Sequence, residues 1–180
     1  MDTPTLKSKN GQMVNDYFKL INKLRKGDES SVELLMNLWH PEGIFEFAGT
    51  PPVIGTYKGA VAIRTLYKNR LNSSGMKLKL DMGKQKLREV SLGIVETEVT
   101  HLREKDNQII AGWRTTIGTE DGRGFDVAGS HMFTIEDGKI KNLRLNISPK
   151  ADTSQMKSLS LNDLSVQDIG RLSLAAWPVV

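Results

Sequence analysis

Residues 39–71, WHPEGIFEFAGTPPVIGTYKGAVAIRTLYKNRL, decide the fold of this chain. An apolar strand is expected over residues 44–47, and Pro51 and Pro52 end it because proline has no N–H to donate to a neighbouring strand. Beyond Gly55, apolar side chains recur at helical spacing, namely Ile63, Leu66, Tyr67 and Leu71. The stretch therefore predicts a short strand, a turn and an amphipathic helix, in that order.

Two further helices are expected before this stretch. The first carries an apolar stripe at helical spacing, formed by Val14, Tyr17, Phe18, Ile21 and Leu24. Residues 1–12 are polar and are expected to be a flexible N-terminus. A capping-box pattern of Ser30 and Glu33 predicts the start of the second helix, and Pro41 predicts its end.

A period of two replaces the helical period after Gly75. Apolar and polar residues alternate in stretches that begin near residues 76, 95, 109, 125 and 140, and turn-forming residues such as Asp137 and Gly138 separate them. The pattern predicts antiparallel strands, so residues 13–148 are expected to form one α+β domain. Residues 149–160 are polar and predict a linker, and residues 161–180 predict a C-terminal helical extension that docks on this chain or on a second copy.

This order of elements resembles the nuclear-transport-factor-2-like superfamily, in particular its SnoaL-like and ketosteroid-isomerase-like branch. The resemblance rests on Leu38-Trp39 before the first strand, on the turn GTPPVIG at residues 49–55, and on EDGKI at residues 136–140. It implies a cone-shaped, cystatin-like roll in which a strongly curved antiparallel sheet wraps around the N-terminal helices. It also implies a deep apolar pocket at the open end and a homodimer through the outer face of the sheet.

The superfamily includes enzymes and non-enzymatic binding modules, so the fold alone does not indicate an activity. Isomerases of the ketosteroid type have a carboxylate base where this chain has Phe47, and their second acid corresponds to a position near Ser130 or His131. Tyr17 corresponds to their tyrosine partner. Because both acids are missing, the resemblance does not imply that particular isomerisation.

The candidate catalytic residues are Asp126, His131 and Tyr17. Asp126 is the best candidate carboxylate in the sheet, and the imidazole of His131 can exchange protons near neutral pH. A period of two places Asp126 on the same face as Ser130 and places His131 on the opposite face, so the two are not expected to act together. The alternative for His131 is a structural histidine of the core or of an interface.

The candidate ligand-binding residues form an aromatic set and a polar set. The aromatic set could line a pocket for a flat apolar ligand or belong to the core, and consists of Trp39, Phe47, Tyr57 and Trp113. The polar set consists of His40, Ser130, Arg144 and Asn146. His40 and Glu42 flank Pro41, where capping and solvation are the simpler explanation. On the last strand, either Leu143 and Leu145 or Arg144 and Asn146 could face the pocket.

Composition limits the other classes of function. The net charge is +4, and basic residues concentrate between Arg64 and Arg88, Arg70 among them. Part of this cluster alternates with apolar residues as on the solvated face of a strand, and a single aromatic lies nearby, so nucleic-acid binding is not expected. The absence of cysteine excludes disulfides and thiolate zinc sites. We expect no metal, no cofactor, no membrane association, and a cytoplasmic location.

Two hypotheses for the function follow. The first is a small-molecule-binding domain with an apolar pocket, with lyase, isomerase or cyclase activity on a hydrophobic carbonyl or polyketide-like substrate as its catalytic version. The second is a non-catalytic homodimeric binding or scaffolding module. The absence of the two acids of ketosteroid-type isomerases favours this second hypothesis. The sequence does not identify the ligand.

Overall fold

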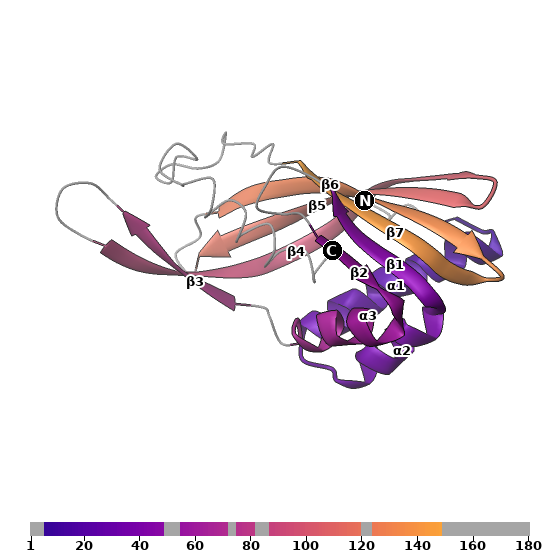
Figure 1. Cartoon of the computed structure of the whole chain (residues 1–180). Coiled ribbons are helices and arrows are strands. Elements are labelled where there is room, and N and C mark those ends of the chain that lie inside the picture. Colours follow the sequence, from indigo (N-terminus) through magenta and orange to yellow (C-terminus); the bar gives the residue numbers. More distant parts are fainter. Residues whose placement is uncertain (1–5, 49–54, 72–74, 82–86, 120–123, 149–180) are drawn as a thin grey trace.

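The computed structural model describes residues 6–48, 55–71, 75–81, 87–119 and 124–148 (Figure 1). The predicted linker and C-terminal helix, at residues 149–180, lie outside this range. The described elements follow the chain as α1 (Lys9–Arg25), α2 (Ser30–Leu38), β1 (Trp39–Ala48), β2 (Gly55–Lys58), α3 (Gly59–Lys68), β3 (Gly75–Asp81), β4 (Leu87–Lys105), β5 (Gln108–Thr119), β6 (Gly124–Glu136) and β7 (Lys139–Ser148). The predicted α+β class is confirmed, with the three helices gathered on one side of a curved sheet (Figure 1).

Helix α1 begins earlier than predicted, whereas α2 begins at Ser30 as predicted but with different hydrogen bonds at its start. Helix α1 starts at Lys9, inside the segment expected to be flexible, because the Ser8 hydroxyl accepts a hydrogen bond from the backbone N–H of Gly11 (2.8 Å). The predicted capping box of α2 does not form. Instead, the Asp28 carboxylate accepts hydrogen bonds from the backbone N–H and hydroxyl of Ser30, at 3.0 and 2.6 Å. Glu33 pairs with α3 through the Arg64 guanidinium.

The sheet has seven strands in the described part of the chain, in the order β2-β1-β7-β6-β5-β4-β3. All neighbours are antiparallel except β1 and β7, which run parallel. Strand β1 is longer than predicted because it begins at Trp39 and continues past Pro41 through a register shift before Ile44. Strand β2 was not predicted from the sequence. It pairs with β1 through four residues and leads directly into α3.

The core lies between the helices and the inner face of the sheet. The apolar stripe predicted for α1 is buried throughout. The strands contribute alternate residues, which are Phe45, Phe47, Ile109, Ala111, Trp113, Phe133, Ile135, Leu143 and Leu145. Because Leu143 and Leu145 are buried, Arg144 and Asn146 are exposed on the outer face of β7. The structure thus decides a choice that the sequence left open.

Candidate functional site

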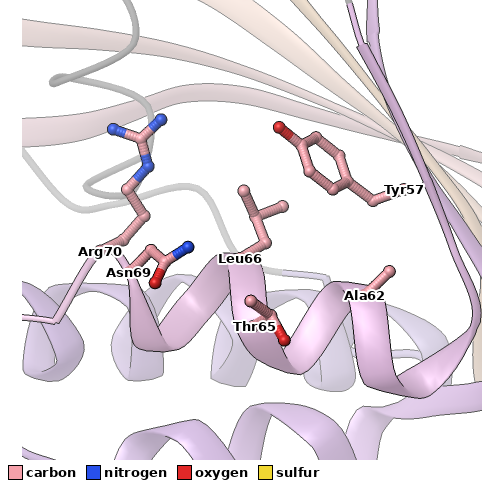
Figure 2. A pocket seen from close by; sticks show the side chains of 6 residues that line it. All are labelled: Tyr57, Ala62, Thr65, Leu66, Asn69 and Arg70. Carbon is pink, nitrogen blue, oxygen red and sulfur yellow. The ribbon is translucent and has the colours of Figure 1, made fainter.

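A pocket of about 400 Å³ lies where β2 meets α3 and the turn that follows α3. Its walls mix apolar and polar side chains, namely Tyr57, Ala62, Thr65, Leu66, Asn69 and Arg70. Figure 2 shows the Tyr57 ring and the Arg70 side chain pointing from opposite sides into the space above Leu66. Pockets of small-molecule sites commonly measure about 300–1,000 Å³, so this one is large enough for a compact ligand.

Strand pairing fixes the position of Tyr57. The residue lies opposite Phe45 in the antiparallel pair of β1 and β2. Its ring meets the rings of Phe45 and Phe47 edge to face, with centroids 6.5 and 6.1 Å apart. Gly59, at φ +83°, allows the chain to turn from β2 into α3, a backbone conformation that side-chain-bearing residues rarely adopt. The Tyr57 wall is therefore held by the sheet, and the opposite wall by the helix.

The end of α3 positions the polar groups of the pocket. The Thr65 hydroxyl donates to the carbonyl of Val61 (2.9 Å), which directs it at its own helix. The backbone N–H of Asn69 donates to the carbonyl of Thr65 (2.9 Å), and that of Arg70 donates to the carbonyl of Tyr67 (3.0 Å). These last-turn bonds order the backbone from which the Asn69 amide and the Arg70 guanidinium extend.

The guanidinium of Arg70 is the principal charge on the pocket wall. Its side chain is partly buried, and this burial lowers the pKa of Arg70, while interaction with the Tyr57 hydroxyl raises it. Arginine remains a cation at neutral pH even after such a shift. The pocket therefore combines an apolar surface with one fixed positive charge, a phenolic hydroxyl and an amide.

A second candidate region is a buried aromatic cluster beneath α1. The imidazole of His131 stacks on Phe133 at 5.8 Å and meets the rings of Phe18, Tyr17 and Trp113 at 5.3, 5.9 and 6.1 Å. His131 and Tyr17 have no exposed surface. The structure thus brings together two of the three predicted catalytic residues, in surroundings that are almost entirely aromatic.

Hydrogen bonding differs sharply within this cluster. Trp39 donates through its indole N–H to the Tyr67 hydroxyl (3.0 Å), which in turn donates to the Tyr17 hydroxyl (3.4 Å). By contrast, both ring nitrogens of His131 and the indole nitrogen of Trp113 are buried without a partner among the described residues. Buried nitrogens of this kind are rare in proteins and point to a ligand or a structural cost.

Burial also determines how these groups titrate. It lowers the pKa of His131 to about 3, because a charged imidazolium would lose its hydration among the aromatic rings. The same desolvation, together with the neighbouring Tyr67 hydroxyl, raises the pKa of Tyr17 well above its ordinary value. At neutral pH both side chains are therefore uncharged, and they can act as hydrogen-bonding groups rather than as ions.

The predicted polar residues Ser130, Arg144 and Asn146 lie outside the pocket lining and the aromatic cluster. Asp126 belongs to β6 and pairs with Thr116, but its side chain lies outside the described part of the structure. Ser130 precedes the buried His131 on β6 and lies next to the exposed Asn146 in the register of β6 and β7. Arg144 is exposed on the same outer face. Ser130, Arg144 and Asn146 therefore do not share the helix-covered face with the buried His131.

The aromatic candidates lie in or beside the core. Trp39, Phe47 and Trp113 are buried there, whereas Tyr57 lines the pocket between β2 and α3. Trp113 packs so closely against Gly129 that an added Cβ there would lie 2.3 Å from an indole carbon. Three of the four predicted aromatic residues thus also serve as core side chains.

His40 belongs to a polar cluster at the start of β1. Its Nδ1 accepts a hydrogen bond from the backbone N–H of Glu42 (3.1 Å), which places the proton of a neutral ring on Nε2. The Lys141 ammonium lies 3.4 Å from the same nitrogen and 3.3 Å from the Glu42 carboxylate. Because the Glu42 side chain is 80% exposed, the arrangement resembles a solvated loop cluster more than a binding site.

Sequence reasoning missed most of the pocket wall, because five of its six residues belong to α3 or to the turn after it. Arg70 was assigned to a solvated basic face, and Asn69 was not singled out within the predicted helix. The available signal was the amphipathic pattern of α3. This pattern predicts that one face of the helix, which includes Leu66, is buried. Arg70 follows Leu66 by about one helical turn, so its side chain is expected at the edge of the core.

The comparisons with known proteins agree with this geometry at the level of the fold. No family model and no curated protein matches the sequence. An NTF2-like protein from Burkholderia xenovorans LB400 shares 14% identity over 86% of this chain and 100% of its own, at a TM-score of 0.53. TerC, co-crystallised with polyporic acid, shares 13% identity over 84% of this chain and 99% of its own, at 0.52. An LEH-like epoxide hydrolase from M. tuberculosis shares 11% identity over 92% and 96%, also at 0.52.

The chain therefore has the nuclear-transport-factor-2-like fold, as the order of its elements predicted. At these identities the likeness concerns the fold and carries no site residue from one protein to another. Within the described part of the chain, no helix is long and apolar enough to cross a membrane.

Proposed function

We propose that this protein is a small-molecule-binding domain of the SnoaL-like kind, and that its ligand occupies the pocket between β2 and α3. The observation that carries the proposal is the pocket itself, with its volume of about 400 Å³, an apolar floor at Leu66 and polar groups at its edges. Small-molecule sites typically pair an apolar lining with a few placed polar groups. The co-crystal of TerC with polyporic acid is compatible with ligand binding in this fold.

The test is to fill the pocket and measure binding of a flat apolar carbonyl compound. Methyl 2-naphthoate is a suitable neutral probe, titrated against the whole chain and followed by chemical-shift changes in NMR. Ala62→Phe places a ring in the pocket, whereas Val61→Phe adds the same ring at a neighbouring position that is 77% exposed. We expect Ala62→Phe to weaken binding at least about tenfold and Val61→Phe to leave it unchanged.

Two results would count against the proposal. One is no measurable binding of the probe to the unmodified protein. The other is equal binding by Ala62→Phe, Val61→Phe and the unmodified protein, which would place the probe elsewhere. Circular dichroism of both variants checks that a loss of binding is not a loss of folding, because neither position belongs to the fully buried core.

A second candidate function is catalysis on a hydrophobic carbonyl, as a lyase, isomerase or cyclase. The observation that favours it is that the nitrogens of His131 and Trp113 have no partner among the described residues, in a cluster that also contains the Tyr17 ring. A neutral imidazole can donate a hydrogen bond to a carbonyl oxygen on which negative charge develops. Asp126 is a separate candidate for the base, because the period of two does not favour joint action with His131. Turnover of a polyketide-like carbonyl library that survives both Asp126→Asn and His131→Phe would exclude these roles.

The alternative is a non-catalytic homodimeric module that associates through the outer face of the sheet. Ile110 and Met132 face each other across β5 and β6 and are only partly buried. Such a cross-strand apolar pair is the kind of surface that a second copy could cover. If so, Met132→Lys should convert a dimer to a monomer in light scattering after gel filtration. A monomeric unmodified protein would exclude this alternative.

A further inference from the structure

The last residue of α1 carries a charge that has no counterpart among the described residues. Arg25 is only 9% exposed, and its Nη1 is buried without a hydrogen-bond partner there. No described carboxylate forms an ion pair with it. Charged side chains are almost never buried in proteins unless they are paired, because dehydration of an isolated charge is costly. An unpaired guanidinium at this depth therefore points to an anionic partner.

We infer that Arg25 binds a small organic carboxylate in a site between the end of α1 and the inner face of β5. This site is separate from the pocket between β2 and α3, to which α1 contributes no residue. A guanidinium presents its N–H groups in a planar fork, which can bind a carboxylate through two parallel hydrogen bonds. The site therefore selects its ligand by charge.

The position of Arg25 on α1 places it on the side of the helix that faces the sheet. Arg25 follows Ile21 by four residues and Phe18 by seven, so the three share one face of the helix. Phe18 packs on the imidazole of His131, with ring centroids 5.3 Å apart, and Ile21 has no exposed surface. Arg25 therefore continues the buried stripe of α1 with a charged side chain.

The direction of α1 leads toward a second unpaired donor. At the start of the helix, the Ser8 hydroxyl donates to the Glu104 carboxylate (2.6 Å), near the hairpin of β4 and β5. Further along, Phe18 lies beside His131, at a greater distance from that hairpin. The next inward-facing side chain of β5 in this direction is Trp113, whose indole nitrogen is buried without a described partner. An anion near the end of α1 could accept a hydrogen bond from it.

The electrostatics around Arg25 also favour an anion. Burial lowers the pKa of Arg25, and no described neighbour counteracts this effect. Arginine nevertheless remains a cation at neutral pH. The negative end of the α1 dipole favours a cation here, but it supplies no hydrogen-bond acceptor to Nη1. An anion would supply both charge and acceptors, in surroundings where charge pairs are stronger than at an open surface.

Benzoate and benzamide are a matched pair of probes, because their shapes are nearly the same and only benzoate is charged at neutral pH. We expect benzoate to bind the unmodified protein at least about tenfold more tightly than benzamide, as a charge-assisted pair should. NMR titration at constant ionic strength measures both affinities. The indole N–H resonance of Trp113 should shift as benzoate binds.

Variants of α1 then assign the preference to one cation. Arg25→Gln should reduce the affinity for benzoate to that for benzamide. Arg25→Lys should retain part of the preference, because an ammonium lacks the planar fork. Lys23→Gln removes the same charge from an exposed position in the same helical turn, so it is the matched control and should change neither affinity.

Stability measurements separate binding from a structural role of Arg25. Arg25→Met keeps an apolar side chain and removes the unpaired charge, so it should unfold at the same urea concentration as the unmodified protein or at a higher one. Benzoate should raise the melting temperature of the unmodified protein and not that of Arg25→Gln, because a ligand stabilises only the folded state that binds it.

Four results would overturn the inference. They are equal affinities of the unmodified protein for benzoate and benzamide, a preference for benzoate that survives Arg25→Gln, a preference that falls equally in Lys23→Gln, and a marked loss of stability in Arg25→Met. The last result would show that the charge already has a partner within the fold. The pocket between β2 and α3 is tested separately, by methyl 2-naphthoate and Ala62→Phe, so either proposal can fail without the other.

Discussion

Replacement of His131 by phenylalanine tests whether this buried histidine costs the fold stability. The imidazole has no exposed surface, stacks on Phe133, and leaves both nitrogens without a partner among the described residues. A phenyl ring of similar shape would keep the aromatic contacts and remove the unpaired polar atoms. Removing such atoms is neutral or stabilising when the packing is kept. At pH 7.5 we therefore expect His131→Phe to be at least as stable as the unmodified protein.

The difference in stability between His131→Phe and the unmodified protein should grow as the pH falls. Burial lowers the pKa of His131 from its ordinary 6.5 to about 3 in the folded chain. Below pH 6.5 the unfolded chain therefore binds a proton that the folded chain excludes, and the free energy of unfolding decreases until the pH reaches about 3. The full difference corresponds to roughly 5 kcal/mol, and about half of it should be lost by pH 4.5.

Urea unfolding at pH 7.5, 5.5 and 4.5 measures this loss. The unmodified protein should lose roughly 2–3 kcal/mol more of its free energy of unfolding than His131→Phe over that range, because the carboxylates contribute equally to both. His101→Gln removes an exposed histidine from β4 and should follow the unmodified protein. Parallel pH profiles of His131→Phe and the unmodified protein would refute the reasoning, because His131 would then be hydrated or partnered in the folded state.

Three further predictions concern packing, hydrogen bonding and a surface ion pair, and chemical unfolding checks each of them. Gly129→Ala should lower the free energy of unfolding by about 3 kcal/mol, because its Cβ would lie 2.4 Å from the backbone carbonyl oxygen of Asn146. Gly112→Ala should lower it by under about 1 kcal/mol, because the nearest atoms belong to the exposed imidazole of His101, which can move. Equal losses would contradict this contrast. Tyr67→Phe should cost about 1–3 kcal/mol, because it leaves a buried indole N–H unpaired, and an unchanged stability would argue against that bond. Glu33→Gln should cost under about 1 kcal/mol and less in high salt, because the pair is largely exposed, and a larger loss would indicate a buried role.

The sequence alone determined the local structure and the class of fold. The stripe from Val14 to Leu24 forms α1, the period of two after Gly75 forms the long strands, and Asp137 and Gly138 form a turn, with φ of 50° and 71°. These patterns depend on neighbours along the chain, because side-chain direction repeats with the period of each element. Residues that lack such a pattern were harder to assign, which is why the short strand β2 was missed.

Only the tertiary structure decided which faces meet and where the pocket lies. A period of two separates Leu143 and Leu145 from Arg144 and Asn146 but does not indicate which pair faces the helices, because both choices satisfy the alternation. The parallel pairing of β1 with β7 joins residues about 100 positions apart, at a distance that no local pattern reaches. Likewise, Arg70 became a wall of the pocket rather than part of a solvated surface because α3 docks beside β2. This contact is decided by packing across the fold and not by the residues adjacent to Arg70 in the chain.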